Sequence, residues 1–99
     1  MQDQDPIRIP IEGALDLHAF APRDIPSVVE DYINEAHEAG LTEVRLIHGR
    51  GHGVQRGIVQ KTLEGHPLVS QFLDDPASHL GATIAILKPQ IRRNADNTE

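Results

Sequence analysis

The chain has 99 residues, a formal net charge of −6 at pH 7 and no cysteine. That length corresponds to one domain, and the lack of cysteine excludes a disulfide framework and a thiolate zinc site. An acidic chain argues against strong, nonspecific nucleic-acid binding, because such surfaces are usually basic. Three aromatic residues are too few for the stacking platforms of many single-strand binders: Phe20, Tyr32 and Phe72.

No apolar run approaches the ~20 residues of a membrane span, and the first ten residues, MQDQDPIRIP, are too polar and acidic for a signal peptide. We therefore expect a cytoplasmic protein with no membrane partner. Residues 1–9 are expected to be a flexible lead, residues 10–89 the folded domain and residues 90–99 a flexible tail. Alternating isoleucines predict an extended edge segment at residues 7–11. Nothing in the sequence indicates an oligomer interface.

The first half of the predicted fold is a strand, a helix and a second strand. Residues 14–18 alternate leucine with polar residues, which predicts a short strand with both leucines on one face. Residues 24–39 repeat apolar residues at intervals of three and four, which predicts a helix. Residues 43–48 predict the second strand. Such a unit within ~35 residues is typical of βαβ, so the two strands should be parallel.

The second half adds a helix and two strands. Residues 54–64 predict the helix, and about 69–75 predict a strand. Residues 82–88 form a nearly continuous apolar run, which suits a strand at the centre of the sheet. We expect the last two strands to pair as a hairpin. The order β-α-β-α-β-β predicts an α/β fold, more closely an α+β two-layer sandwich, with a mixed four-stranded sheet and both helices on one face.

Polar residues end both strands of the βαβ unit. Asp16 and His18 close the first strand, and His48 closes the second. Because the carboxyl ends of parallel strands meet at one edge of a sheet, we expect these side chains to converge. Ligands of open α/β sheets bind at that edge.

The second strand leads into the next helix through a glycine-rich turn, residues 48–53, with the sequence His-Gly-Arg-Gly-His-Gly. Glycine permits positive φ and close approach of backbone to a ligand. Such a turn aims N–H groups beside the positive end of a helix dipole, which favours phosphate. A tight, solvated turn is the alternative, and the local charge weighs against it. No carboxylate and four cations lie between Val44 and Lys61: Arg45, Arg50, Arg56 and Lys61.

Four segments together resemble the small MutS-related (Smr) domain family. They are Leu15-Asp16-Leu17-His18, Ile47-His48-Gly49-Arg50-Gly51, His66-Pro67-Leu68-Val69 with Phe72, and Gly81-Ala82-Thr83-Ile84. The resemblance runs from about residue 10 to residue 88. It implies the β-α-β-α-β-β sandwich, similar to the C-terminal domain of bacterial translation initiation factor three. Several family members nick or cleave DNA or RNA, whereas others only bind nucleic acid, and some are short stand-alone chains like this one.

The resemblance assigns candidate roles to residues of this chain. The catalytic candidates match the polar residues of the family's two motifs: Asp16, His18 and His48. The nucleic-acid-binding candidates are the glycine turn and a basic residue of the following helix: Gly49, Arg50, Gly51, His52, Gly53 and Arg56. Two departures from the family pattern are Ala19, where glycine usually follows the histidine, and residues 79–82, where a Gly-Gly pair is common.

The expected mechanism places the scissile phosphate on the Gly49–Gly53 amides and Arg50. His18 acts as general base or acid near neutral pH, and Asp16 orients its imidazole or holds a divalent metal. With His48 as a second acid or base, RNA is cleaved through its 2′-OH without metal. With hydrated Mg²⁺ on Asp16, either nucleic acid is hydrolysed. One carboxylate is a weak metal site, so no cofactor is assigned and Mg²⁺ stays an alternative.

Other interpretations remain open. In one alternative Asp16 only caps the turn after its strand, and His18 is a buried histidine bonded to backbone. Three further histidines are expected at the surface or in turns: His37, His66 and His79. The function is therefore that of a DNA or RNA endonuclease or, alternatively, a noncatalytic nucleic-acid or phosphate-binding module. A protein-interaction domain that uses the acidic helix at residues 24–39 is the weakest alternative.

Overall fold

The computed structural model describes residues 13–49 and 53–90. The expected edge segment at residues 7–11, the flexible lead and nearly all of the tail lie outside these ranges. No helix in the described ranges is long and apolar enough to cross a membrane. The cytoplasmic location stays a prediction.

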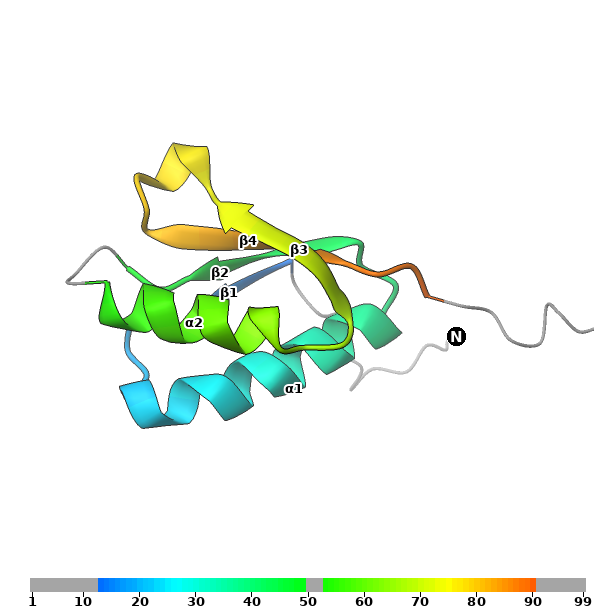
Figure 1. Cartoon of the computed structure of the whole chain (residues 1–99), viewed down its shortest axis with the longest axis horizontal. Coiled ribbons are helices and arrows are strands. Elements are labelled where there is room, and N and C mark those ends of the chain that lie inside the picture. Colours follow the sequence, from blue (N-terminus) through cyan, green and yellow to red (C-terminus); the bar gives the residue numbers. More distant parts are fainter. Residues whose placement is uncertain (1–12, 50–52, 91–99) are drawn as a thin grey trace, which may run out of the picture.

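Four strands form one mixed sheet, and two helices cover one of its faces (Figure 1). The strands lie in the order β1-β2-β4-β3; β1 is parallel to β2, and β4 is antiparallel to both of its neighbours. The predicted fold, the parallel pair and the central position of the last strand are therefore confirmed. The elements are β1 (Ala14–Asp16), η1 (Pro22–Asp24), α1 (Ile25–Glu38), β2 (Glu43–Ile47), α2 (Val54–Glu64), β3 (Val69–Asp74), η2 (Pro76–Ser78) and β4 (Ala82–Leu87).

Helix α1 is followed by a glycine that reverses the chain. Gly40 has φ 88°, a left-handed conformation that costs glycine little. The N–H of Gly40 donates to the carbonyl of His37 at 3.0 Å, and that of Leu41 to the carbonyl of Ala36 at 3.0 Å. This pair of bonds is a Schellman motif, which satisfies carbonyls left without partners at the helix end. The reversal directs the chain into β2.

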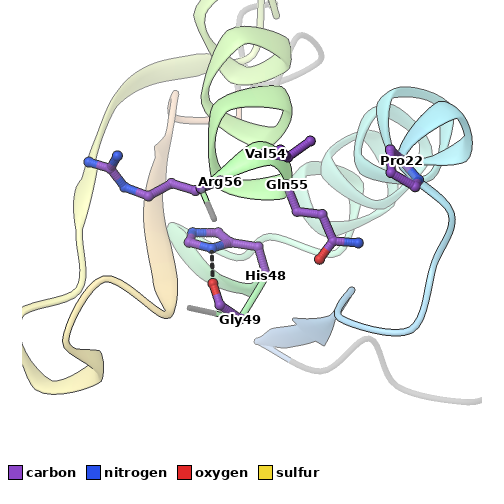
Figure 2. A pocket seen from close by; sticks show the side chains of 7 residues that line it. Pro22, His48, Gly49, Val54, Gln55 and Arg56 are labelled. Atoms are coloured by element: carbon purple, nitrogen blue, oxygen red, sulfur yellow. Dashed lines mark hydrogen bonds between the residues drawn. The ribbon is translucent and has the colours of Figure 1, made fainter. Parts of the chain in front are cut away.

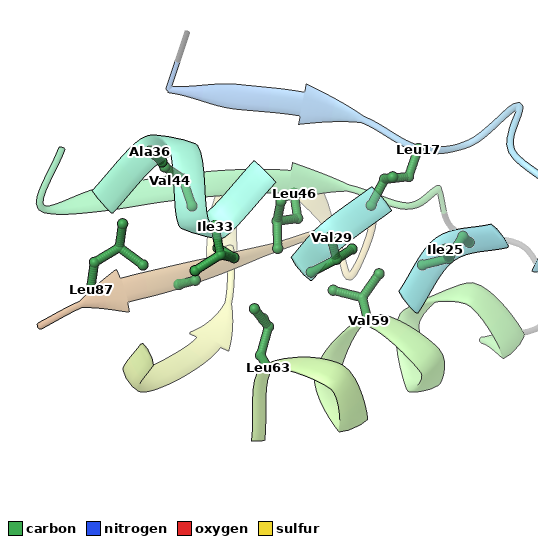
Figure 3. Close-up of a cluster of buried hydrophobic side chains, with 11 residues drawn as sticks. Leu17, Ile25, Val29, Ile33, Ala36, Val44, Leu46, Val59, Leu63 and Leu87 are labelled. Carbon is green, nitrogen blue, oxygen red and sulfur yellow. The ribbon is translucent and has the colours of Figure 1, made fainter. Parts of the chain in front are cut away.

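The core fills the layer between the helices and the sheet (Figure 3). Helix α1 contributes Ile25, Val29, Ile33 and Ala36, all fully buried and spaced along one face. Each large aliphatic side chain buried in this way contributes about 1.5–3 kcal/mol. The sheet, α2 and the segment after β1 supply the rest of the cluster: Leu17, Val44, Leu46, Val59, Leu63, Ala85 and Leu87. This packing fixes the ends of β1 and β2 against the start of α2.

Two local predictions differ from the structure. The first strand ends at Asp16 rather than His18, because the chain turns after Leu17, whose N–H still donates to the Ile47 carbonyl at 2.7 Å. His66 lies in a turn but is only 6% exposed. Its ring Nδ1 accepts from the Leu68 N–H at 3.1 Å, so the ring folds back under the turn.

Candidate nucleic-acid site

The two polar motifs meet at the edge of the sheet where β1 and β2 end. A Cβ built on Gly49 would lie 3.6 Å from the Cβ of His18, so the two residues are in contact range. The parallel pairing of Asp16 with Ile47 holds them together. Gly49 has φ 85°, which explains why glycine follows His48 at this crowded position.

Asp16 and His18 form an exposed hydrogen-bonded pair. The Asp16 Oδ1 lies 2.6 Å from the ring Nδ1 of His18 and also accepts from the His18 backbone N–H at 3.0 Å. A carboxylate only accepts, so Nδ1 carries the proton and Nε2 is the basic nitrogen of the neutral ring. The side chain of Asp16 is 55% exposed and that of His18 is 66% exposed. Asp16 thus orients the imidazole as well as closing the turn, and His18 is not a buried structural histidine.

The hydrogen bond from the His18 ring, and next the one from its backbone, lower the pKa of the Asp16 carboxyl. The carboxylate is therefore ionised at neutral pH. The pair has the geometry of a general base and its orienting group.

His48, by contrast, is buried, with 2% of its surface exposed. Its ring Nδ1 lies 3.0 Å from the Gly49 carbonyl oxygen, and its Nε2 lies 2.9 Å from Thr83 Oγ1. A carbonyl only accepts, so Nδ1 donates and Nε2 accepts from the Thr83 hydroxyl. Both nitrogens are engaged. The catalytic role expected for His48 stays a prediction, and in this structure it would require release of the ring from Thr83.

Thr83 belongs to a polar network that reaches the surface. Its Oγ1 accepts from Gln60 Nε2 at 3.0 Å, and the same nitrogen lies 3.0 Å from Asp74 Oδ1. Asp74 in turn receives two bonds from the Arg56 guanidinium, at 2.8 and 2.7 Å. The positive charge of Arg56 is neutralised by Asp74 in this arrangement. It therefore adds no unpaired positive charge to the site. Its role as a nucleic-acid ligand stays a prediction.

A pocket of about 210 Å³ opens at the N-terminus of α2 (Figure 2). Gly53 caps the helix at φ 83° without a side-chain hydrogen bond. The first-turn N–H groups have no intrahelical partner, and the dipole makes this end positive, so the pocket suits an anion. The lining residues are Pro22, His48, Gly49, Gly53, Val54, Gln55 and Arg56.

The turn between β2 and α2 contributes less than expected in its described part. The Gly49 N–H donates to the Gly81 carbonyl at 3.0 Å and is unavailable to a phosphate. Arg50, Gly51 and His52 lie outside the described residues. The amides that the structure offers to a phosphate are therefore those of the first turn of α2.

Comparison with known proteins identifies the family of this chain. The model of the Smr domain family matches residues 15–88. This chain belongs to the Smr domain family. Among curated relatives, Endonuclease MutS2 of Clostridium botulinum is 36% identical over 62 residues, which are 63% of this chain and 8% of that protein. Endonuclease MutS2 of Lactococcus lactis is 36% identical over 80 residues, which are 79% of this chain and 10% of that protein.

Solved Smr structures share the fold. The Smr domain of Thermus thermophilus MutS2 superposes with a TM-score of 0.75 at 29% identity, over 79% of this chain and all of that one. YdaL, a stand-alone small MutS-related protein from Escherichia coli, gives 0.71 at 24% identity, over 77% of this chain and 64% of that one. This Smr chain spans at most a tenth of the MutS2 relatives named above, so their whole-protein activity is not transferred by similarity alone.

Sequence reasoning missed three members of the site's polar network: Gln60, Asp74 and Thr83. Gln60 follows Arg56 by four residues in α2, a spacing that places both on one helix face and was an available signal. Thr83 lies in one of the motifs that indicated the Smr family, but its hydrogen-bond partner His48, which follows β2, is 35 residues away in the chain. Within the described ranges, no group of three or more histidine, cysteine or carboxylate side chains is placed to hold a metal.

Burial lowers the pKa of His48 below its ordinary 6.5 and outweighs the hydrogen bond to the Gly49 carbonyl, which acts in the opposite direction. Between the lowered value and 6.5 the unfolded chain therefore binds a proton at His48 that the folded Smr domain does not. Stability must then fall as pH drops through this window. We expect the Tm of the wild type to decrease from about pH 7.5 to about pH 5.5, and His48→Gln to flatten that slope. Equal slopes in thermal melts of the two proteins would contradict this assignment.

Proposed function

We propose that this Smr domain is an endonuclease that binds nucleic acid at the edge where β1, β2 and α2 meet. The observation that carries the proposal is the exposed Asp16–His18 pair, with its 2.6 Å contact. Neither residue lines the pocket at the N-terminus of α2, but His18 is in contact range of Gly49, which does. A base with a defined basic nitrogen thus stands next to a site suited to phosphate. The relationship to proteins named Endonuclease MutS2 supports the same reaction class.

In the proposed reaction, a backbone phosphate lies against the first-turn N–H groups of α2. His18 Nε2 removes a proton from the attacking oxygen, either water or the 2′-OH of RNA, as that oxygen bonds to phosphorus. Asp16 stabilises the resulting imidazolium. The helix N-terminus balances the negative charge that builds on the phosphate oxygens. The bond to the leaving oxygen then breaks, and the imidazolium or water returns a proton to it.

A divalent ion fits this site only loosely. Asp16 is one carboxylate, and no metal-binding cluster exists among the residues that the structure describes. Mg²⁺ would be held through water and substrate phosphates, with Asp16 as its protein ligand, and would supply charge neutralisation. Mg²⁺ is therefore varied in the cleavage assay and is not assigned as a resident cofactor.

Noncatalytic binding of nucleic acid is the second candidate. The observation that favours it is the burial of His48, which leaves His18 as the one exposed catalytic histidine candidate in the described part of the site. A site with one acid–base group lacks a second group, so the same imidazole must deprotonate the attacking oxygen and protonate the leaving oxygen. The module would use the same α2 N-terminus and retain affinity without turnover.

The deciding experiment is cleavage of end-labelled single- and double-stranded DNA and RNA by purified protein, with Mg²⁺ and with EDTA. Asp16→Ala and His18→Ala are assayed beside the wild type. Cleavage lost in both variants supports the endonuclease, and survival of wild-type cleavage in EDTA supports a metal-free reaction. Binding without cleavage by the wild type establishes the module instead. Cleavage equal in all three proteins would show that the activity belongs to a contaminant.

A further inference from the structure

The loop between β3 and β4 holds a leucine in an unfavourable state. Leu80 has φ 72° and is 53% exposed, and the preceding His79 has φ 53°. They are the two non-glycine residues with positive φ in the described ranges. Left-handed backbone is strained for a bulky residue, and exposure of leucine brings no hydrophobic gain. Neither the backbone nor the packing of this fold favours leucine at position 80.

The surrounding hydrogen bonds impose this conformation. The carbonyl of Gly81 accepts from the backbone N–H groups of both His48 and Gly49, each at 3.0 Å. Ser78 donates its hydroxyl to the Asp75 carbonyl at 2.8 Å and accepts from the Ala82 N–H at 2.9 Å. The loop is thus tied at both of its ends, and strained residues persist where their surroundings over-determine them. Such strain is found most often at functional sites.

The same hydrogen bonds join the loop that carries Leu80 to the edge of the candidate site, although Leu80 itself does not line the pocket. Gly81, the next residue, bonds directly to Gly49, which is itself in contact range of His18. Two other exposed apolar side chains border this region. Val54 lines the pocket and is 58% exposed, and Phe20, which is 38% exposed, receives a 2.8 Å hydrogen bond from Gln55 at its carbonyl. The anion site is therefore flanked by apolar groups.

We propose that Leu80 packs against an unstacked base of the strand whose phosphate lies at the α2 N-terminus. The site would then take single-stranded or locally opened nucleic acid in preference to a continuous duplex. Bases expose apolar faces when they are unstacked, and proteins use leucine and similar side chains as wedges against them. This inference rests on the proposed nucleic-acid binding and adds the class of substrate.

The test compares wild type with Leu80→Asn. Asparagine is close to leucine in size and tolerates left-handed backbone, so it removes the apolar contact while relieving strain. Affinity for a single-stranded oligonucleotide is expected to fall roughly 5–10-fold, while the Tm is unchanged or rises by a few degrees. With 2-aminopurine placed in the oligonucleotide, the wild type is expected to raise its fluorescence by unstacking it, and Leu80→Asn to raise it less.

Leu73→Asn is the matched control, because Leu73 is an exposed leucine on the edge strand β3 with 45% of its surface accessible. Leu80→Gly, which also suits positive φ, serves if asparagine impairs folding. Equal affinity of Leu80→Asn and wild type would overturn the inference, as would an equal loss in Leu73→Asn. Failure of the wild type to bind any nucleic acid would overturn the proposed function as well, so the two failures are distinguishable.

Discussion

His18→Ala is expected to slow cleavage about 10²–10⁴-fold, the usual contribution of a positioned acid–base group. The side chain of His18 is 66% exposed, so folding should be unaffected. Affinity should change little, because the proposed phosphate contacts come from the backbone of α2. The measurements are single-turnover cleavage rates, oligonucleotide affinity and Tm. Equal losses in rate and affinity would instead assign His18 a binding role.

Asp16→Asn tests whether the carboxylate partner of His18 is needed for cleavage. The asparagine amide can donate to Nδ1 as well as accept from it, so the ring is no longer held with its proton on Nδ1. Cleavage should fall by about 10²-fold or more, as happens when a carboxylate partner of a catalytic histidine is made neutral. His37→Ala, on α1, is the matched control and should cleave like wild type. A fully active Asp16→Asn would remove orientation of His18 from the mechanism.

Thr83→Val is expected to destabilise the Smr domain by about 1–3 kcal/mol, because it leaves the buried Nε2 of His48 without its hydrogen-bond donor. Gln60 keeps its contact with Asp74. Thr83 is fully buried, and its hydroxyl donates to His48 Nε2 while accepting from Gln60. Valine keeps the shape and removes only the hydroxyl. Urea or thermal denaturation measures the change in free energy of unfolding.

Thr83→Ser is the control for this substitution. Serine keeps the hydroxyl and loses one methyl group, so its cost should be near that of one buried methyl, about 1 kcal/mol. If valine destabilised no more than serine, the hydroxyl would contribute nothing to the fold. In that case the hydrogen bond between His48 and Thr83 would not be what holds the adjacent Gly49 in place.

The fold was predictable because its signals are local. The apolar spacing within residues 25–36, the glycines at the helix ends and the apolar run of β4 each depend on near neighbours in the chain. The parallel arrangement of β1 and β2 followed from the length of the connection. These features located the edge at which His18 and Gly49 meet. The predicted end of β1 was wrong, because the chain turns at Leu17 and the strand is two residues shorter than predicted.

The electrostatics of the site were not predictable, because they depend on partners distant in the chain. His48 binds Thr83, 35 residues away, and Arg56 binds Asp74, 18 residues away. A basic stretch and two histidines looked accessible in the sequence, whereas the sheet register buries one histidine and the β3 carboxylate neutralises the arginine. The left-handed backbone of Leu80 is held by local bonds of Ser78 and Gly81 and also by bonds from His48 and Gly49, which lie more than 30 residues earlier in the chain.

The position of β4 has a consequence for biosynthesis. This strand is the last of those in residues 13–49 and 53–90, yet it lies between β2 and β3. Until Leu87 has left the ribosome, β2 and β3 have no strand to join them, and their main-chain groups and apolar faces stay unprotected. The β1–β2 pair and the two helices can associate earlier, but the sheet closes in one late step. Nascent chains stalled short of β4 should therefore be substrates for chaperones and proteases rather than native-like fragments.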